Sequence, residues 1–404
     1  MSATAHFRPT FTDLRAEIER RVAQGEPEDS IAQLVDQFLA AGGGLPAPVI
    51  EYDGTVTWIY RDSAAHHVAV VGDILGYDPT QTHMTNLARC DVFYLTVQLP
   101  LDTQIAYAFC VDQPSPPDAA DIEPWLAHCR PDPLNPYQVL ATHPLRLMSV
   151  LTMPGAGEPD TMLHRSSIPS PAVALGVIPG SHTGRLHRVW VHTPAELHSA
   201  ISRYPVCYFL DGESYLLAGH MPHILDTLVA EGEIVPCVAV FVETPSALSI
   251  DAVDAVQIEQ TLIHDIVPWI DTHYPTSTDP RDRVICGAHR YASVALHTAL
   301  VAADTFGGVI AQSPALDILT TEIARQIAAL LTENVNLPRS YLDVGRYESI
   351  AAHQYVHSLC NALMTGGAEL SYQEFPGDGG FLGWRSTAVD ALRTHFGTAT
   401  MPEL

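Results

Sequence analysis

Hydrophobic positions in the first part of the chain change from helical to strand-like spacing. Apolar side chains recur every three or four residues in 12–23 and 30–41, which predicts two amphipathic helices. Short runs rich in β-branched and aromatic residues follow at 55–60, 67–71, 92–98 and 104–111. Clusters of Asp, Gly and Pro separate these runs, so we expect a small antiparallel, immunoglobulin-like sandwich after a helical lead-in.

The second part of the chain alternates compact apolar runs with segments of helical period. The apolar runs lie at 189–192, 206–210, 235–242, 284–286, 308–311 and 339–344. The segments of helical period lie at 221–231, 258–273, 292–303, 320–331 and 350–364. This alternation predicts an α/β fold with a doubly wound, mostly parallel sheet, and functional residues at the carboxyl ends of its strands.

These patterns divide the 404-residue chain into four segments. We expect a helical lead-in at 1–45, a sandwich domain at 46–150, a linker at 151–180 and an α/β domain at 181–404. Two cores agree with a chain too long for one ordinary core.

Charge restricts the classes of partner. The formal net charge is −26, which disfavours binding to nucleic acid or to anionic membranes. No apolar run approaches the roughly 18 residues of a membrane span, and Met1–Arg8 does not resemble a secretory signal, so we expect a cytoplasmic protein. All basic residues are arginine, which excludes a Schiff-base lysine and a Walker A lysine.

The seven cysteines are scattered singly and mostly within apolar runs. This usage suits free, buried thiols in a reducing compartment, and it favours neither a disulfide framework nor a structural zinc site.

One stretch carries the most specific signal for chemistry. An apolar run from Val284 ends at Gly287 and restarts as an Ala-rich amphipathic segment, which predicts a strand, a sharp turn and a helix. In α/β-hydrolases such a turn is the nucleophile elbow, G-x-S-x-G, with serine at its apex. Here the apex residue is His289, and Tyr291 takes the place of the second small residue.

An ordered set of motifs resembles the two-domain enterochelin esterase family. They are Asp132-Pro133-Leu134-Asn135-Pro136, Arg188-Val189-Trp190-Val191-His192-Thr193-Pro194, Tyr208-Phe209-Leu210-Asp211-Gly212-Glu213, Asp265-Ile266-Val267-Pro268-Trp269, Ala311-Gln312-Ser313, Asp343-Val344-Gly345-Arg346-Tyr347-Glu348 and Gly379-Gly380-Phe381-Leu382-Gly383-Trp384-Arg385. The resemblance implies an α/β-hydrolase fold behind an amino-terminal sandwich. It also implies cytoplasmic hydrolysis of trilactone siderophores.

The departures from that family fall on the catalytic triad. His289 stands where the resemblance places the serine nucleophile, and Gly379 stands where it places the general-base histidine. Glu348 looks like the surviving carboxylate. Efficient hydrolysis by the family mechanism is therefore not expected.

The altered site could still transfer protons. His289 can act as a general base or acid, with Glu348 or Asp378 orienting its ring. Arg290 offers a fixed cation for a carboxylate or an enolate, and Tyr291 could donate a proton or only fill space.

Further candidate substrate contacts follow other motifs. Gly212 and Glu213 come shortly after the run at 206–210. We expect Trp384 and Arg385 near the pocket mouth, with burial of Trp384 in the core as an equal alternative. His353 and His357 share one face of a predicted helix, but no third ligand has an obvious spacing, so we expect neither a metal nor a cofactor.

These observations favour a non-hydrolytic acid/base enzyme, performing cyclisation, elimination, epimerisation or rearrangement with His289 as base. The substrate would be a peptide-, polyketide- or siderophore-like metabolite, either free or bound to a carrier protein. A catalytically inert binding protein and a residual esterase or lactonase using His289-activated water remain alternatives. A homo-oligomer is also an open alternative.

Overall fold

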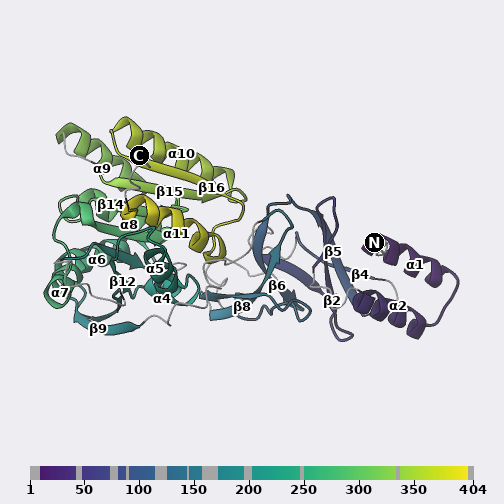
Figure 1. The fold of residues 1–404 in the computed structure, drawn as a ribbon. Helices are drawn as coiled ribbons and strands as arrows, with labels where there is room; N and C mark the ends of the chain where they lie inside the picture. The colour runs from purple at the N-terminus through teal and green to yellow at the C-terminus, as the bar shows by residue number, and fades with distance from the viewer. Residues whose placement is uncertain are drawn as a thin grey trace, which may run out of the picture. The chain divides into compact units, whose positions relative to one another are not determined.

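The computed structural model describes residues 10–41, 48–72, 81–87, 91–113, 125–142, 145–156, 172–194, 203–245, 250–333 and 337–398 (Figure 1). The chain forms two compact units, residues 1–157 and 158–404. In the described residues, no helix is long and apolar enough to cross a membrane. The six cysteines that the structure describes are free and buried, while Cys90 lies outside the described residues.

A pair of helices opens the first unit. Helix α1 (Phe11–Ala23) begins at a capping box, in which Thr10 and Asp13 satisfy each other's backbone N–H groups. Helix α2 (Glu28–Ala41) follows after a short turn. Their apolar faces bury Phe11, Ile18 and Ile31 against strand residues such as Ile59 and Val92. The predicted lead-in is therefore anchored by hydrophobic contact with the sheet that follows.

Two four-stranded antiparallel sheets form the rest of the first unit. One has the order β1 (Val49–Ile50), β2 (Thr55–Arg61), β5 (Val92–Gln98), β4 (Thr85–Asn86). The other has the order β3 (Val68–Gly72), β6 (Gln104–Val111), β8 (Leu145–Thr152), β7 (Gln138–Thr142). Trp58 of one sheet and Tyr107 of the other meet edge to face, with ring centroids 5.7 Å apart. This sandwich agrees with the predicted fold class.

The Asp132–Pro136 motif contributes a buried polar contact to the sandwich. The carboxylate of Asp132 accepts a 2.7 Å hydrogen bond from the Tyr107 hydroxyl. The side-chain amide of Asn135 donates to the Val150 carbonyl at 2.8 Å. Buried polar groups need such partners, so the motif serves to close this core.

An eight-stranded sheet organises the described part of the second unit. Its order is β16 (Leu370–Phe375), β15 (Arg339–Gly345), β14 (Gly308–Gln312), β13 (Arg283–Ala288), β11 (Val206–Leu210), β12 (Val238–Val242), β10 (Leu186–His192), β9 (Val173–Pro179). Strand β10 pairs antiparallel with both of its neighbours, β9 and β12, and the remaining five pairs are parallel. The mostly parallel sheet confirms the predicted α/β class.

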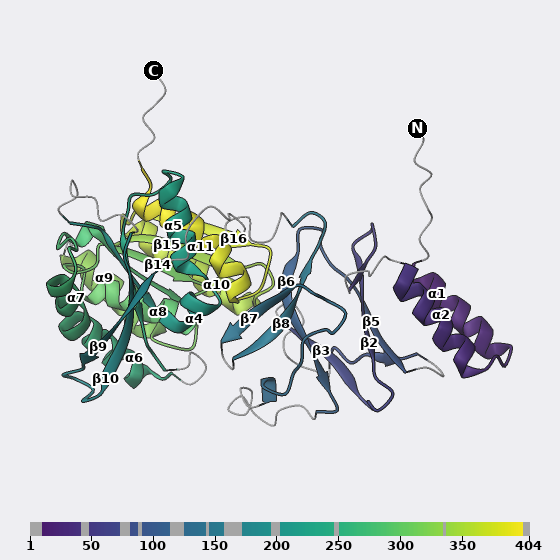
Figure 2. The same cartoon turned by 60° about the horizontal axis from the view of Figure 1, so that its bottom comes forward.

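Helices cover both faces of this sheet (Figures 1 and 2). One face packs on a core shared by α6 (Ala252–Thr261), α7 (Val267–His273), α8 (Arg290–Val301), α9 (Thr320–Glu333) and α10 (Ile350–Thr365). The other face packs on α4 (Gly212–Leu217), α5 (Met221–Ala230) and α11 (Phe381–Phe396). A two-sided cover is what parallel strands require, because both of their faces are apolar.

Several elements differ from the expectation. Strand β9 lies inside the segment expected as a linker, of which 157–171 fall outside the described residues. Strand β16 and helix α11 appear where no element was expected, and the expected helix at 258–273 is interrupted by a π-helical turn at Leu262–Ile266. β9 and β16 are edge strands whose partly exposed residues give weak periodicity.

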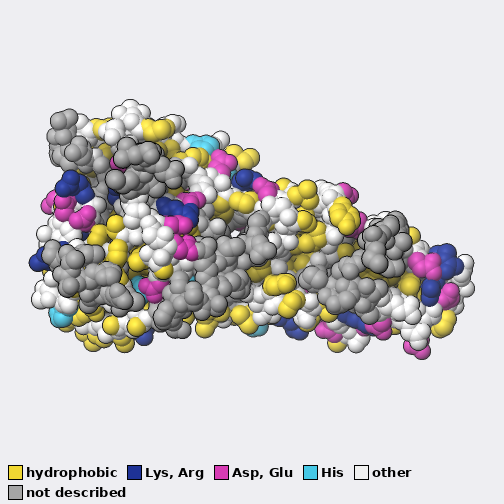
Figure 3. Space-filling view, in the orientation of Figure 1, with side chains coloured by type: hydrophobic (Ala, Val, Ile, Leu, Met, Phe, Trp, Pro, Cys, Tyr) yellow, Lys and Arg dark blue, Asp and Glu magenta, His cyan; other side chains and the backbone are white. Residues whose placement is uncertain are grey.

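Ion pairs accompany the acidic surface. Arg61 pairs with Asp91 at 2.9 Å, and Arg393 pairs with Glu233 at 2.6 Å. In Figure 3, basic and acidic side chains lie next to one another at several places on the visible face. Such exposed pairs add little stability. Because the carboxylates outnumber the arginines, they set the sign of the surface charge.

A sharp turn joins β13 to α8 and allows their backbones to come very close. A Cβ atom added at Gly287 would lie 2.1 Å from the Tyr291 carbonyl oxygen. No side chain fits there, so glycine at 287 is a steric requirement of this turn.

We predict that Gly287→Ala lowers the free energy of unfolding by at least about 2 kcal/mol, because the backbone must move apart in a packed core. The midpoint of urea denaturation measures the effect. Gly379→Ala is the control: the nearest atom to its added Cβ is a ring carbon of Trp384 at 3.3 Å, so a loss below about 1 kcal/mol is expected. Equal losses in the two variants would contradict the prediction.

Candidate functional site

His289 occupies the apex of the turn between β13 and α8. Its backbone has φ 54° and ψ −121°, a conformation that non-glycine residues rarely adopt. The His289 N–H donates to the Gln312 carbonyl at 2.8 Å, and the His289 carbonyl accepts from the Ala315 N–H at 3.2 Å. Backbone contacts therefore hold this strained conformation, which costs on the order of 1–3 kcal/mol, whatever side chain is present.

Two neighbouring strands end in the same unusual way. Asp211, directly after β11, has φ 57°, and Ser313, directly after β14, has φ 49°. Strands β11, β13 and β14 are adjacent in the sheet, so three left-handed residues follow one another along its carboxyl edge. Strained backbone of this kind concentrates at functional sites in α/β proteins.

A pocket of about 360 Å³ opens at this edge. It is lined by His289, Ser313, Pro314, Ala315, Leu316, Asp317, Glu348, Ser349, Ala351, Ala352, Asp378 and Gly379. The three residues predicted to be catalytic, His289, Glu348 and Asp378, thus lie in one pocket although nearly ninety positions separate the first from the last.

Burial of the His289 ring favours its neutral form. Burial lowers its pKa from the ordinary value of 6.5, and Asp317 only partly opposes this effect. Among the described residues, no hydrogen bond to the ring is found, so neither Glu348 nor Asp378 orients it as the sequence suggested. A neutral imidazole with a free ring nitrogen can accept a proton from a bound molecule.

Glu348, which also lines the pocket, is held in place by two hydrogen bonds. Its carboxylate accepts hydrogen bonds from the Ser313 hydroxyl at 2.6 Å and from the Gly345 N–H at 2.7 Å. Burial raises its pKa, an effect that these two hydrogen bonds oppose in part. Asp378 accepts from the Gly379 N–H at 2.8 Å. The pocket therefore combines the imidazole of His289 with two carboxyl groups whose oxygens already accept hydrogen bonds from the protein.

Ser313 is a central residue that the sequence analysis quoted only as part of a motif. Besides donating to Glu348, its hydroxyl accepts from the Trp384 indole N–H at 3.0 Å. Its backbone N–H donates to buried Asp343 at 2.9 Å, and burial raises the pKa of Asp343 to about 7. Thr387 donates to the other Asp343 oxygen at 2.6 Å. This buried network fixes Ser313 and, through it, Glu348.

Gly379 faces the surviving carboxylate. A Cβ atom at this position would lie 3.5 Å from the carboxyl carbon of Glu348 and 3.3 Å from a ring carbon of Trp384. The backbone φ of Gly379 is not among the positive ones. A side chain is therefore sterically acceptable there, and it would begin beside Glu348.

The predicted substrate contacts on α8 lie outside the pocket lining. Tyr291 is fully buried, and its hydroxyl donates to the Pro245 carbonyl at 2.7 Å. Arg290 forms an ion pair with Asp317 at 2.5 Å and donates to the Ile250 carbonyl at 3.3 Å. The structure therefore places Arg290 beside the pocket, where it holds Asp317, a residue that does line it.

The other predicted contacts also lie outside the pocket lining. Trp384 and Arg385 lie in α11 and are buried, so Trp384 supports Ser313 from behind the pocket wall and Arg385 faces the Ala218 carbonyl at 3.4 Å. Gly212 is buried against the backbone of Phe241, and Glu213 is exposed. None of these four residues lines the pocket.

The pocket residues do not form a recognisable metal site. In the described part of the chain, the single group of three His, Cys, Asp or Glu side chains close enough to share an ion is His353, His357 and Glu374. The pocket places a His289 imidazole together with the carboxyl groups of Glu348 and Asp378, an arrangement that suits proton transfer.

Comparisons with known proteins agree with the fold. Residues 180–393 match the family described as "Putative esterase", and residues 55–162 match the family described as "Enterochelin esterase, N-terminal". Among curated proteins, the uncharacterised protein YjcH of Bacillus subtilis strain 168 is 27% identical over 142 residues. That alignment covers 34% of this chain and 59% of YjcH.

Solved structures align over both units. Ferric enterobactin esterase from Salmonella typhimurium aligns with a TM-score of 0.71 and 20% identity, covering 88% of this chain and 98% of that one. Enterobactin esterase from Shigella flexneri, crystallised in the presence of enterobactin, aligns with a TM-score of 0.68 and 20% identity, covering 84% and 92%. Because the esterase match spans more than half of the residues and follows the amino-terminal match, the chain belongs to the two-domain, enterochelin esterase-like part of this esterase family.

Proposed function

We propose that this protein is a proton-transfer enzyme with His289 as its general base, acting without a covalent intermediate on a siderophore-like, peptide or polyketide metabolite. The observation that carries the proposal is the position of the His289 imidazole at the strained apex, in one pocket with Glu348 and Asp378. A decayed site needs no titratable group at this position.

The proposed reaction follows from two residues that line the pocket, His289 and Glu348. His289 would remove a proton from a substrate carbon next to a carbonyl group, and the electron pair of that C–H bond would move onto the carbonyl oxygen to give an enolate. Helix α8 begins directly after His289, and the partial positive charge of its amino-terminal end stabilises such an oxyanion. Glu348, whose pKa is raised by burial, could return a proton at another atom.

Return of the proton to another carbon gives an isomerisation. Attack of the enolate carbon on a second carbonyl carbon, whose oxygen takes the proton, gives a cyclisation. Breaking of the bond to a substituent on the next carbon, which leaves with the electron pair and takes the proton, gives an elimination.

The substrate class rests on the family. The Shigella flexneri relatives were crystallised in the presence of enterobactin and of 2,3-dihydroxy-N-benzoyl-serine. At 20% and 21% identity these likenesses concern the fold alone, so a siderophore-like substrate is our proposal for this chain. Delivery on a carrier protein, a homo-oligomeric state and a cytoplasmic setting belong to the same proposal.

Two other functions each have one observation in their favour. A non-catalytic binding protein is favoured by the carboxylates, since Glu348 is already engaged by Ser313 and Gly345 instead of orienting His289. Hydrolysis by a water molecule that His289 activates is favoured by membership of an esterase family.

We predict that His289→Ala abolishes turnover of the natural substrate, with a loss of about 100-fold or more, because a general base contributes this much. Wild type and variant are incubated with a metabolite extract of the host, and the products are compared by mass spectrometry. Tyr291→Phe is the matched control, because its hydroxyl contacts the Pro245 backbone outside the pocket.

The three functions give different results in this experiment. Consumption of a metabolite by wild type with no change in mass supports isomerisation or cyclisation, and loss of a small neutral molecule supports elimination. A gain of one water molecule would instead indicate hydrolysis. A co-purifying small molecule without any turnover would make the protein a binder and would refute the enzymatic proposal.

The pH dependence has a definite sign. The base form of His289 is lost as pH falls through its pKa, and burial places that pKa below 6.5. We therefore expect kcat/KM to fall at acid pH with a midpoint below 6.5. A midpoint above 7 would count against His289 as the base.

The elbow also predicts a gain of function. In the variant His289→Ser/Gly379→His, serine would take the strained apex and histidine would begin beside Glu348, restoring the order of a hydrolytic triad. We expect this variant to hydrolyse a p-nitrophenyl ester at least about 100-fold faster than wild type and than either single variant. Equal rates of ester hydrolysis in wild type, the two single variants and the double variant would contradict the prediction. They would show that a histidine introduced at position 379 does not act as the general base.

A further inference from the structure

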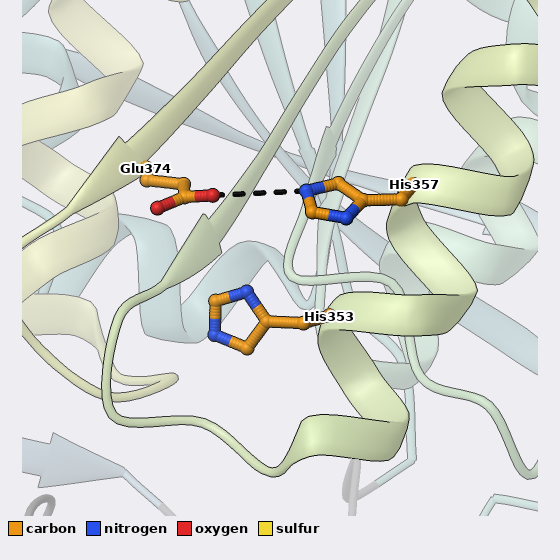
Figure 4. A group of neighbouring side chains, drawn as sticks. All are labelled: His353, His357 and Glu374. Carbon is orange, nitrogen blue, oxygen red and sulfur yellow. Dashed lines mark ion pairs between the residues drawn. The ribbon is translucent and has the colours of Figure 1, made fainter.

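We propose that the second unit binds a divalent transition-metal ion, with Zn²⁺ as the natural candidate, through His353, His357 and Glu374. One ligand atom of each residue lies within 4.8 Å of the others. Figure 4 shows the two imidazoles and the carboxylate turned toward a common space. This group lies outside the pocket lining and is independent of the proposed function.

The site arises where a helix passes beside the edge strand of the sheet. His353 and His357 are four residues apart in α10, so they project from one face of that helix. Glu374 comes from β16, at the edge of the sheet, and reaches toward them from the side (Figure 4). Its carboxylate lies 3.6 Å from the His357 Nε2 atom. Two structural elements therefore supply the three ligands.

The ligand set suits zinc. Two imidazoles and one carboxylate form a common three-ligand combination for this ion, with water in the fourth position. Ligand atoms of a tetrahedral zinc site lie about 3.3 Å apart, so the three side chains must close by about 1.5 Å at most. His357 and Glu374 are exposed and His353 is half-buried, which leaves these side chains free to rotate by that amount.

Tyr372 supplies the supporting contact that metal ligands usually have. Its hydroxyl donates to a Glu374 oxygen at 2.9 Å, and it lies two residues earlier in the same strand. The same hydroxyl lies 2.9 Å from the His357 Nε2 atom. On binding, the metal would replace the hydroxyl at His357 while the hydrogen bond to Glu374 remains, which orients the carboxylate.

The position of the site gives the metal a structural consequence. Ser349, Ala351 and Ala352, at the start of α10, line the pocket, and His353 follows directly. A metal ion would therefore tie the pocket-bearing end of α10 to the sheet edge at β16. Because an ion that binds only the folded state stabilises it, the thermal midpoint should rise with metal concentration.

Calorimetric titration of tag-free protein with Zn²⁺ at about pH 7.5, where free imidazole is deprotonated, tests the proposal. We expect one ion per chain and a metal-dependent rise in the thermal midpoint. His353→Ala, His357→Ala and Glu374→Gln should each weaken affinity at least about tenfold, and Tyr372→Phe should weaken it less. Co²⁺ absorption gives a second readout, since a tetrahedral site produces strong visible bands.

A matched control distinguishes binding at this site from nonspecific binding of Zn²⁺ by exposed histidine side chains. His66→Ala/His67→Ala removes two exposed neighbouring imidazoles from the first unit and should leave Zn²⁺ binding unchanged. The proposal is overturned by an equal loss in this control and in His353→Ala/His357→Ala. It is also overturned if Glu374→Gln retains full affinity, since the histidine pair would then bind alone. Circular dichroism confirms that each variant is folded.

Discussion

The close approach of the Gly287 backbone to the Tyr291 carbonyl determines how the second unit is built around its site. Only a residue without a side chain lets β13 turn this sharply into α8. As a result, α8 descends directly over the sheet, and its residues from 291 to 300 are buried. The same turn leaves His289 at the carboxyl edge, where the pocket opens. One steric contact thus fixes both the main core and the position of the proposed base.

A layer of buried polar groups lies behind the pocket and makes it rigid. Asp343 binds Ser313 and Thr387, and Ser313 in turn binds Glu348 and Trp384. Each of these groups would be costly to bury without a partner, so they hold one another in place. This explains how helix α11, which contributes no side chain to the pocket lining, still shapes the wall that carries Glu348.

The sequence predicted what depends on continuous burial and on local motifs. Central strands such as β13 are buried throughout because helices cover both faces, whereas the edge strands β9 and β16 are partly exposed. His289, Glu348 and Asp378 follow strands or turns of the predicted type, and they do share a pocket. Trp384, Arg385 and Tyr291 are buried outside the pocket lining, because a polar group on a large side chain can find a buried partner that no spacing reveals. Glu374 was missed for a related reason: it meets His353 and His357 from a different element.

The backbone of the site is fixed by residues other than the one at its apex. Gly287 sets the turn, and the backbone groups of Gln312 and Ala315 hold position 289 through its own N–H and carbonyl. The side chain at 289 can therefore be exchanged without refolding the protein around it. In evolutionary terms, the backbone of the site can be conserved while the side chain at position 289, and with it the reaction, changes. Substitutions at this position can then alter the activity, while selection for stability maintains the residues that fix the turn.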